Sequence, residues 1–139
     1  MSVRLVLDVS VALTWCFEDE MTPERIAFLD RLKDAAIIVP PLWHVELANA
    51  LIQGQRRGRI DQSAIGEFDA LIRQLDIRTD HGRERDGLLA LIDLARLHGL
   101  TADDAVYLEL ALRLAVPLAT HDLALQRAAR LAGVEVIGG

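Results

Sequence analysis

The stretch Val3-Arg4-Leu5-Val6-Leu7-Asp8 decides the fold expected for this chain of 139 residues. A short apolar run that stops at an acid is typical of a strand buried on both faces. The runs Ala36-Ile37-Ile38-Val39 and Val116-Pro117-Leu118-Ala119 have the same form. Helical patterns separate these runs, so the sequence predicts an α/β fold with a parallel sheet covered by helices on both faces.

Capping residues and apolar spacing place the other elements of this single domain, residues 1–139. Thr22-Pro23-Glu24 has a cap residue, a proline at the first helical position and an early acid, so a helix begins there. Gly99 and Gly133 stand where C-cap glycines belong. We expect helices from residue 10 onward and over 22–34, 42–55, 61–75, 85–98, 101–114 and 123–132, a weak edge strand at Ile77 and a last strand over 134–137.

Composition limits the classes of function. The net charge of −6 argues against binding nucleic acid through overall charge, so a polyanion would need a local basic patch or a bound metal. The clearest basic cluster, Arg56-Arg57-Gly58-Arg59, is typical of a solvated helix end. Cys16 is the only cysteine, which excludes an intrachain disulfide and suits a reducing compartment. Asp8 interrupts the first apolar run too early for a signal peptide or a membrane span, so we expect a cytoplasmic protein.

Four acids stand where strands end or helices begin: Asp8, Glu46, Asp104 and Asp122. Each has a structural explanation, because three of them could cap helices and Glu46 could belong to a polar stripe with Asn49. In open parallel sheets, however, ligands bind beyond the carboxyl ends of the strands, where these acids would converge. Oxygen ligands gathered in this way suit Mg²⁺, with Mn²⁺ as a substitute.

Other sites fit the sequence less well. The pattern His44-x-Glu46 lacks the paired cysteines of a zinc deaminase, and no phosphate-binding glycine loop occurs. A receiver domain would need a lysine after a late strand, but the only lysine is Lys33.

The chain resembles PIN-domain ribonucleases, and specifically VapC-type toxins of bacterial toxin–antitoxin pairs. The matching segments are Leu7-Asp8-Val9-Ser10, residues 43–51, residues 100–111 and Leu118-Ala119-Thr120-His121-Asp122, in the same order and spacing. The acid directly before Ala-x-Tyr is the ligand in that family, which selects Asp104 over Asp103. The resemblance implies a three-layer α/β/α PIN-like fold, Mg²⁺-dependent endonucleolytic cleavage of RNA, a homodimer and inhibition by a small antitoxin.

On this hypothesis Asp8 and Asp104 bind the metal directly, and Asp122 and Glu46 complete the site directly or through water. Ser10 and Thr120 would orient these ligands, and Asn49 would hydrogen-bond Glu46 or the substrate. Two alternatives stay open: a catalytically silent PIN-like module that binds a protein, and a metal-dependent hydrolase of another phosphate ester.

The aromatic residues Trp15, Phe17 and Phe28 fall on the first two expected helices. More apolar side chains lie there than one buried face needs, which predicts an exposed interface. The resemblance implies that an antitoxin segment lies in a groove there. The alternative is that all three aromatics belong to the core.

Overall fold

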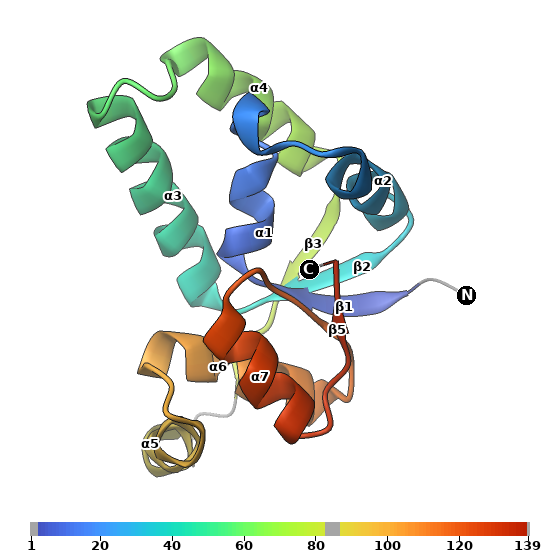
Figure 1. Cartoon of the computed structure of the whole chain (residues 1–139), viewed down its shortest axis with the longest axis vertical. Coiled ribbons are helices and arrows are strands. Elements are labelled where there is room, and N and C mark those ends of the chain that lie inside the picture. Colours follow the sequence, from blue (N-terminus) through green and yellow to red (C-terminus); the bar gives the residue numbers. More distant parts are fainter. Residues whose placement is uncertain (1–2, 83–86, 139) are drawn as a thin grey trace.

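A computed structural model describes residues 3–82 and 87–138 of the chain, and Figure 1 shows the arrangement of its elements. Its centre is a five-stranded sheet in the order β3-β2-β1-β4-β5, in which every paired strand is parallel. The strands are β1 (Arg4–Leu7), β2 (Ala36–Val39), β3 (Asp76–Thr79), β4 (Leu118–Ala119) and β5 (Val136–Ile137). The prediction of a parallel sheet is therefore confirmed.

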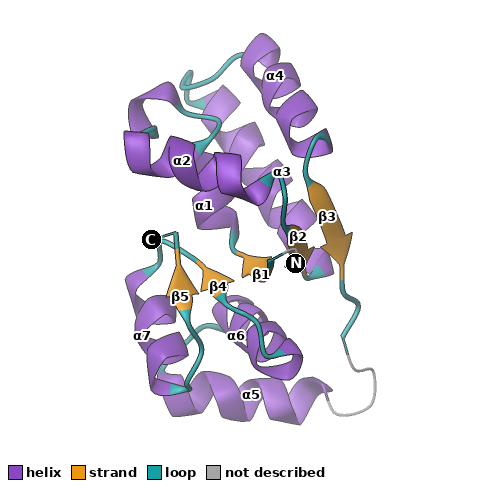
Figure 2. Ribbon diagram, turned by 90° about the vertical axis from the view of Figure 1, so that its right-hand side faces the viewer, coloured by secondary structure: helices purple, strands orange, loops and turns teal. Residues whose placement is uncertain are grey.

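Helices cover both faces of the sheet, which gives the expected three-layer α/β/α fold. Figure 2 shows α1 to α4 on one side of the strands and α5 to α7 on the other. The helices are α1 (Val9–Thr14), α2 (Pro23–Leu32), α3 (Pro41–Arg56), α4 (Gln62–Arg73), α5 (Gly87–His98), α6 (Ala102–Leu114) and α7 (Leu123–Leu131), with a short 3-10 turn, η1, at Glu18–Glu20. No helix in residues 3–82 and 87–138 is long and apolar enough to cross a membrane.

The chain order makes β1 the centre of the sheet, because β2 pairs with one of its edges and β4 with the other. Val6 lies opposite Ile38 on one side and opposite Leu118 on the other. Leu5, Val6 and Leu7 are fully buried, whereas the edge strand β3 is largely exposed, as its polar sequence predicts. The order of strands reverses between β1 and β4, and in open sheets such a switch point is where ligands bind.

The predicted helix starts are confirmed by side-chain caps. Thr22, Asp61 and Thr101 each accept a hydrogen bond from a backbone N–H of the first turn that follows. Gly99 and Gly133 have φ values of +64° and +84°, which other residues rarely adopt. The helix expected over 85–98 is described from Gly87, so its predicted start at Arg85 lies outside the described residues.

Three boundaries differ from the prediction. Strands β4 and β5 have two residues each because Val116 and Val134 donate their N–H groups to Ala111 and Ala129 and so close the preceding helices. The first helix ends at Thr14 instead of continuing to Phe17. The N–H groups of Trp15 and Cys16 bond to carbonyls three residues back, which tightens the chain out of the α-helix.

The expectation of an exposed aromatic surface on the first two helices is wrong. Trp15, Phe17 and Phe28 are all buried, so the alternative that they belong to the core is right. Phe17 lies beyond the end of α1, and Phe28 packs against the C-terminal segment, where a Cβ on Gly138 would come within 2.5 Å of its ring. The sequence does not show these contacts because they depend on how the chain folds back after α1.

Candidate metal centre

Asp8 directly follows β1 and is buried, with 7% of its surface exposed. Its Oδ2 atom accepts two hydrogen bonds, from Ser10 Oγ at 2.6 Å and from Thr120 Oγ1 at 2.7 Å. Asp8 occupies the N-cap position of α1 but makes no side-chain cap hydrogen bond. Capping therefore does not explain this acid, and the expected roles of Ser10 and Thr120 in holding it are consistent with their positions.

The hydroxyl groups of Ser10 and Thr120 also accept hydrogen bonds from the segment that follows β4. Ser10 Oγ accepts a hydrogen bond from His121 N at 2.9 Å, and Thr120 Oγ1 accepts one from Asp122 N at 3.1 Å. Asp122 Oδ1 in turn accepts from Leu125 N at 2.9 Å and caps α7. The capping explanation is thus right for Asp122, but it occupies only one of its two carboxylate oxygens.

Glu46 reaches this edge of the sheet from α3 and is held by Tyr107 of α6. The Tyr107 hydroxyl donates to Glu46 Oε1 at 2.6 Å, and the tyrosine is 1% exposed. The expected hydrogen bond from Asn49 to Glu46 is absent within the described residues, and Asn49 is exposed. A role of Asn49 toward substrate stays a prediction.

Tyr107 is the residue of this site to which sequence reasoning gave no role. The sequence signal was its position three residues after Asp104, on the same face of a helix. Asp104 itself lies in the first turn of α6, where its backbone N–H donates to Thr101 Oγ1 at 3.3 Å. Thr101 therefore caps α6, at the helix start expected from the sequence.

Neighbouring acids contribute to the raised pKa values of Glu46 and Asp104, which is consistent with their lying in the same region as Asp8. Burial, followed by the charges of Asp122 and Asp8, raises the pKa of Asp104 above its ordinary value. Burial also raises the pKa of Glu46; the Tyr107 hydrogen bond opposes this, and the charges of Asp8, Asp103 and Asp104 add to it. The pKa of Tyr107 is raised by burial and by its bond to Glu46, so its hydroxyl remains a donor.

Asp80 shows the opposite arrangement at the same edge of the sheet. It directly follows β3, and its carboxylate accepts from Arg113 Nη2 at 2.8 Å. Hydrogen bonding from Arg113 lowers the pKa of this carboxyl group. Asp80 is thus neutralised by the chain itself, whereas no salt bridge within the described residues involves Asp8, Glu46, Asp104 or Asp122.

These residues suit a hard divalent cation by their chemistry. All four offer carboxylate oxygens, and a cation would relieve the repulsion that adds to the effect of burial in raising the pKa values of Glu46 and Asp104. Across residues 3–82 and 87–138, no group of three or more His, Cys, Asp or Glu side chains lies close enough together to hold a metal ion.

The raised pKa values predict how the metal-free protein responds to pH. Folded Glu46 and Asp104 keep protons that the unfolded chain has already released, so the free energy of unfolding falls as pH rises from their ordinary values of 4.5 and 3.8 through the raised ones. Urea unfolding of EDTA-treated protein between roughly pH 4 and 7 measures this decline. A Glu46→Gln, Asp104→Asn double variant should show no such decline in the free energy of unfolding. An identical decline in that variant would mean that other groups, and not Glu46 and Asp104, cause it.

Comparisons with known proteins agree with the fold. A family model for the PIN domain matches residues 5–131. A crystal structure of PAE2754 from Pyrobaculum aerophilum is similar with a TM-score of 0.69 and 22% identity, over 97% of this chain and 84% of that one. A domain of a functionally unknown protein from Methanocaldococcus jannaschii is similar with a TM-score of 0.52 and 23% identity, over 97% and 89% of the two chains. No curated protein matches the chain.

At these identities the two solved structures show the fold alone, whereas the family model spans most of the sequence. PIN domains are generally metal-dependent nucleases that use divalent ions. The match begins inside β1 and ends at the last residue of α7, so it contains all four acids and the hydroxyl groups that hold Asp8. The chain belongs to the PIN domain family.

Proposed function

We propose that this protein is a Mg²⁺-dependent endoribonuclease and the toxin of a toxin–antitoxin pair. One observation carries the nuclease assignment: Asp8 and Asp122 follow adjacent parallel strands at the switch point, and Glu46 and Asp104 lie near enough for neighbouring carboxylates to add to the effect of burial on their pKa values. The general activity of PIN domains supports it. The toxin role rests on the resemblance of the four motifs to VapC-type proteins.

In this proposal Asp8 and Asp104 bind the metal directly, while Asp122 and Glu46 complete the site directly or through water. A bound divalent ion supplies Lewis acidity for a phosphoryl oxygen and lowers the pKa of a water that attacks phosphorus. The chain's own contribution is orientation, because Ser10 and Thr120 fix the buried Asp8 carboxylate through one oxygen.

Substrate binding has to rely on local contacts because the net charge is −6. Arg59, part of the clearest basic cluster in the sequence, is already engaged by the protein. Its Nη2 atom lies 3.3 Å from Asp19, and its guanidinium stacks 4.0 Å from the centre of the Phe17 ring. We therefore expect RNA to bind mainly through the carboxylate–metal centre and the surface around it.

The test is cleavage of end-labelled RNA by the purified protein in Mg²⁺ or Mn²⁺, with EDTA as the control. Metal-dependent internal cuts are expected. Metal-dependent hydrolysis of a simple phosphate ester without RNA cleavage would favour the general hydrolase. Absence of both activities, with a folded protein, would favour the protein-binding module.

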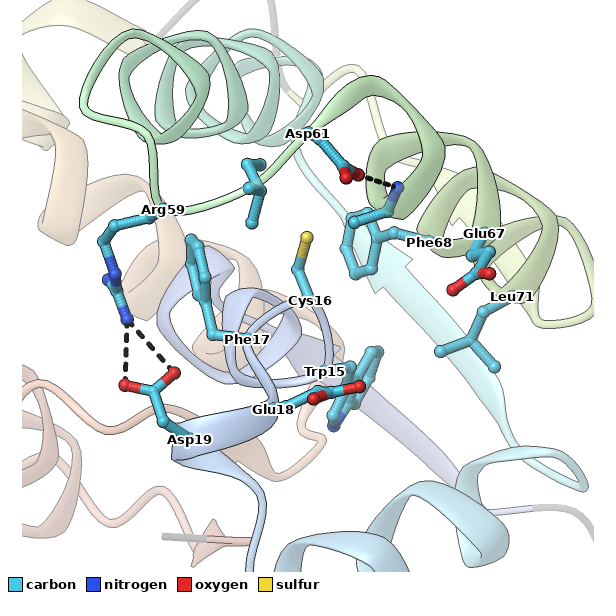
Figure 3. A pocket seen from close by; sticks show the side chains of 12 residues that line it. Trp15, Cys16, Phe17, Glu18, Asp19, Arg59, Asp61, Glu67, Phe68 and Leu71 are labelled. Carbon is cyan, nitrogen blue, oxygen red and sulfur yellow. Dashed lines mark hydrogen bonds and ion pairs between the residues drawn. The ribbon is translucent and has the colours of Figure 1, made fainter.

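The partner part of the proposal places an antitoxin segment in a groove of about 870 Å³ between the end of α1 and α4. Figure 3 shows Trp15 and Phe17 on one side of it and Phe68 and Leu71 of α4 on the other. The acids that line it are Glu18, Asp19, Asp61 and Glu67, and its only basic lining residue is Arg59. A partly apolar segment with basic side chains fits this lining. The homodimer and the cytoplasmic location follow from the resemblance and the sequence and complete the proposal.

Glu67→Lys tests this docking better than a change at buried Trp15, which would also disturb the core. Glu67 is exposed on α4, so its replacement should leave stability unchanged but weaken binding of a basic segment about tenfold. Titration calorimetry with the proposed antitoxin measures the affinity. Asp93→Lys makes the same charge change on α5, across the sheet, and should bind normally. Equal affinities for both variants would place the antitoxin elsewhere.

A further inference from the structure

Three of the acids share a pattern of hydrogen bonding. Asp8, Glu46 and Asp122 each have one carboxylate oxygen held by donors of the chain. The second oxygen of each (Asp8 Oδ1, Glu46 Oε2 and Asp122 Oδ2) accepts no hydrogen bond from residues 3–82 and 87–138. The chain thus presents three single oxygens to whatever binds there.

Tyr107 is the least expected of these donors. It is buried in α6 and reaches Glu46 of α3 across 61 positions of sequence, so the bond depends on the packing of two helices. The two donors to Asp8 are Ser10, in the first turn of α1, and Thr120, directly after β4, and the donor to Asp122 is a backbone N–H. Tyr107→Phe removes the bond to Glu46 and keeps the shape of the ring.

We propose that Tyr107 is a positioning residue that commits Glu46 to one free oxygen and thereby sets which divalent cation the carboxylates accept. The proposal rests on the proposed function for the existence of the metal site. Mg²⁺ and Mn²⁺ take octahedral sets of single oxygens and water, whereas Ca²⁺ accepts six to eight oxygens and often both oxygens of one carboxylate. The hydrogen bond from Tyr107 to Oε1, at 2.6 Å, holds the Glu46 carboxylate in one orientation and leaves Oε2 as its oxygen without a hydrogen bond, which favours binding an ion through that single oxygen. Tyr107 therefore favours the smaller ions.

Tyr107→Phe tests this role through metal binding measured without RNA. The ring still fills its buried place, but Glu46 loses its donor and can rotate. The dissociation constant for Mn²⁺ should rise about 10- to 100-fold, the range seen when a group that orients a metal ligand is removed. Ca²⁺ should bind Tyr107→Phe no more weakly than it binds the wild type. The ratio of Mn²⁺ affinity to Ca²⁺ affinity should therefore fall in this variant. Titration calorimetry with each ion gives both constants.

Thr14→Val is the matched control. Thr14 is also buried, and its hydroxyl donates to the Val11 carbonyl at 2.7 Å, away from the four acids. It loses a buried hydroxyl in the same way and should bind both ions as the wild type does. A loss of Mn²⁺ preference in this control equal to that in Tyr107→Phe would mean that general loosening of the core explains the effect, and would overturn the proposal.

A double-mutant cycle with Glu46→Gln shows whether Tyr107 acts through Glu46. If it does, Tyr107→Phe changes metal binding in the wild-type background and changes nothing further in Glu46→Gln. Additive effects, or an unchanged ratio of Mn²⁺ to Ca²⁺ affinity in Tyr107→Phe, would overturn the positioning role alone. Failure of the wild type to bind Mn²⁺ would overturn the proposed function as well, so the two failures are distinguishable.

NMR spectra of the wild-type protein test the role of Tyr107 without a substitution. Tyr107 is the only tyrosine in the chain, so its ring signals in NMR spectra are unambiguous. Adding Mg²⁺ should leave the Tyr107 hydroxyl proton hydrogen-bonded and slow to exchange, because only the free oxygen of Glu46 is used. Fast exchange of that proton in saturating Mg²⁺ would contradict the proposal.

Discussion

Asp8→Asn is expected to lower RNA cleavage by about 10³-fold or more while the protein stays folded, since loss of a metal's Lewis acidity is worth several kcal/mol. The hydroxyls of Ser10 and Thr120 donate to Asp8 Oδ2, and the amide oxygen of Asn can accept those bonds in its place. That orientation turns the NH₂ group to the position of Oδ1. A donor group then faces the metal where a carboxylate oxygen is needed.

The matched control is Asp61→Asn. Asp61 caps α4 by accepting from Ala64 N at 2.8 Å, and Asn is an equally good cap. This variant makes the same chemical change away from the four acids and should cleave RNA at the wild-type rate. Initial rates in saturating Mg²⁺ and far-UV circular dichroism should be measured on both. Near wild-type turnover in Asp8→Asn would remove Asp8 from the metal site, and loss of its fold would assign the residue a structural role.

The position of Asp8 beside Asp122 could be predicted from the sequence because it depends on few assumptions. Each follows an apolar run that has the length and pattern of a buried parallel strand. Parallel strands of one sheet direct their carboxyl ends to the same edge, so both acids had to lie there. The structure adds that the two strands are neighbours, which sequence patterns do not determine.

The partners of Glu46 could not be predicted in the same way. Its place on α3 followed from helical spacing, but its bond to Tyr107 depends on how α3 and α6 are oriented across the sheet edge. Asn49 was the expected partner because it lies one turn away on the same helix. Local spacing therefore favoured the wrong hydrogen bond, although Tyr107 stands one turn after Asp104 in the motif itself.

The hydrogen bonds of Asp122 were also not predictable from local sequence, so capping and metal binding were treated as alternatives for this residue. One oxygen accepts from Leu125 N, and the other accepts no hydrogen bond within the described residues, so the two roles are compatible. A carboxylate has enough acceptor sites to cap a helix and bind an ion together. Helix capping by an acid is thus no argument against its being a metal ligand.

Saturating Mn²⁺ is expected to raise the melting temperature of the wild type on the order of 10 °C. An ion at a hundred times its dissociation constant stabilises the folded state by about 2.7 kcal/mol, since the scattered acids of the unfolded chain do not bind it. Asp104→Asn should lose most of this rise in melting temperature, because the pKa of Asp104 is raised by burial and then by the charges of Asp122 and Asp8, which lie near its carboxylate.

Asp103→Asn is the control for this melting experiment, since it makes the same change one position away. Asp103 is exposed, and its charge is the smallest of the causes that raise the pKa of Asp104. Asp103→Asn should keep most of the rise in melting temperature that Mn²⁺ causes. Scanning calorimetry with and without EDTA measures this rise. If Asp103→Asn lost more of this rise in melting temperature than Asp104→Asn, Asp103 would be the metal ligand in place of Asp104. If saturating Mn²⁺ left the wild-type melting temperature unchanged, the four carboxylates would not form a metal site, and the protein-binding module would be the better account of this PIN domain.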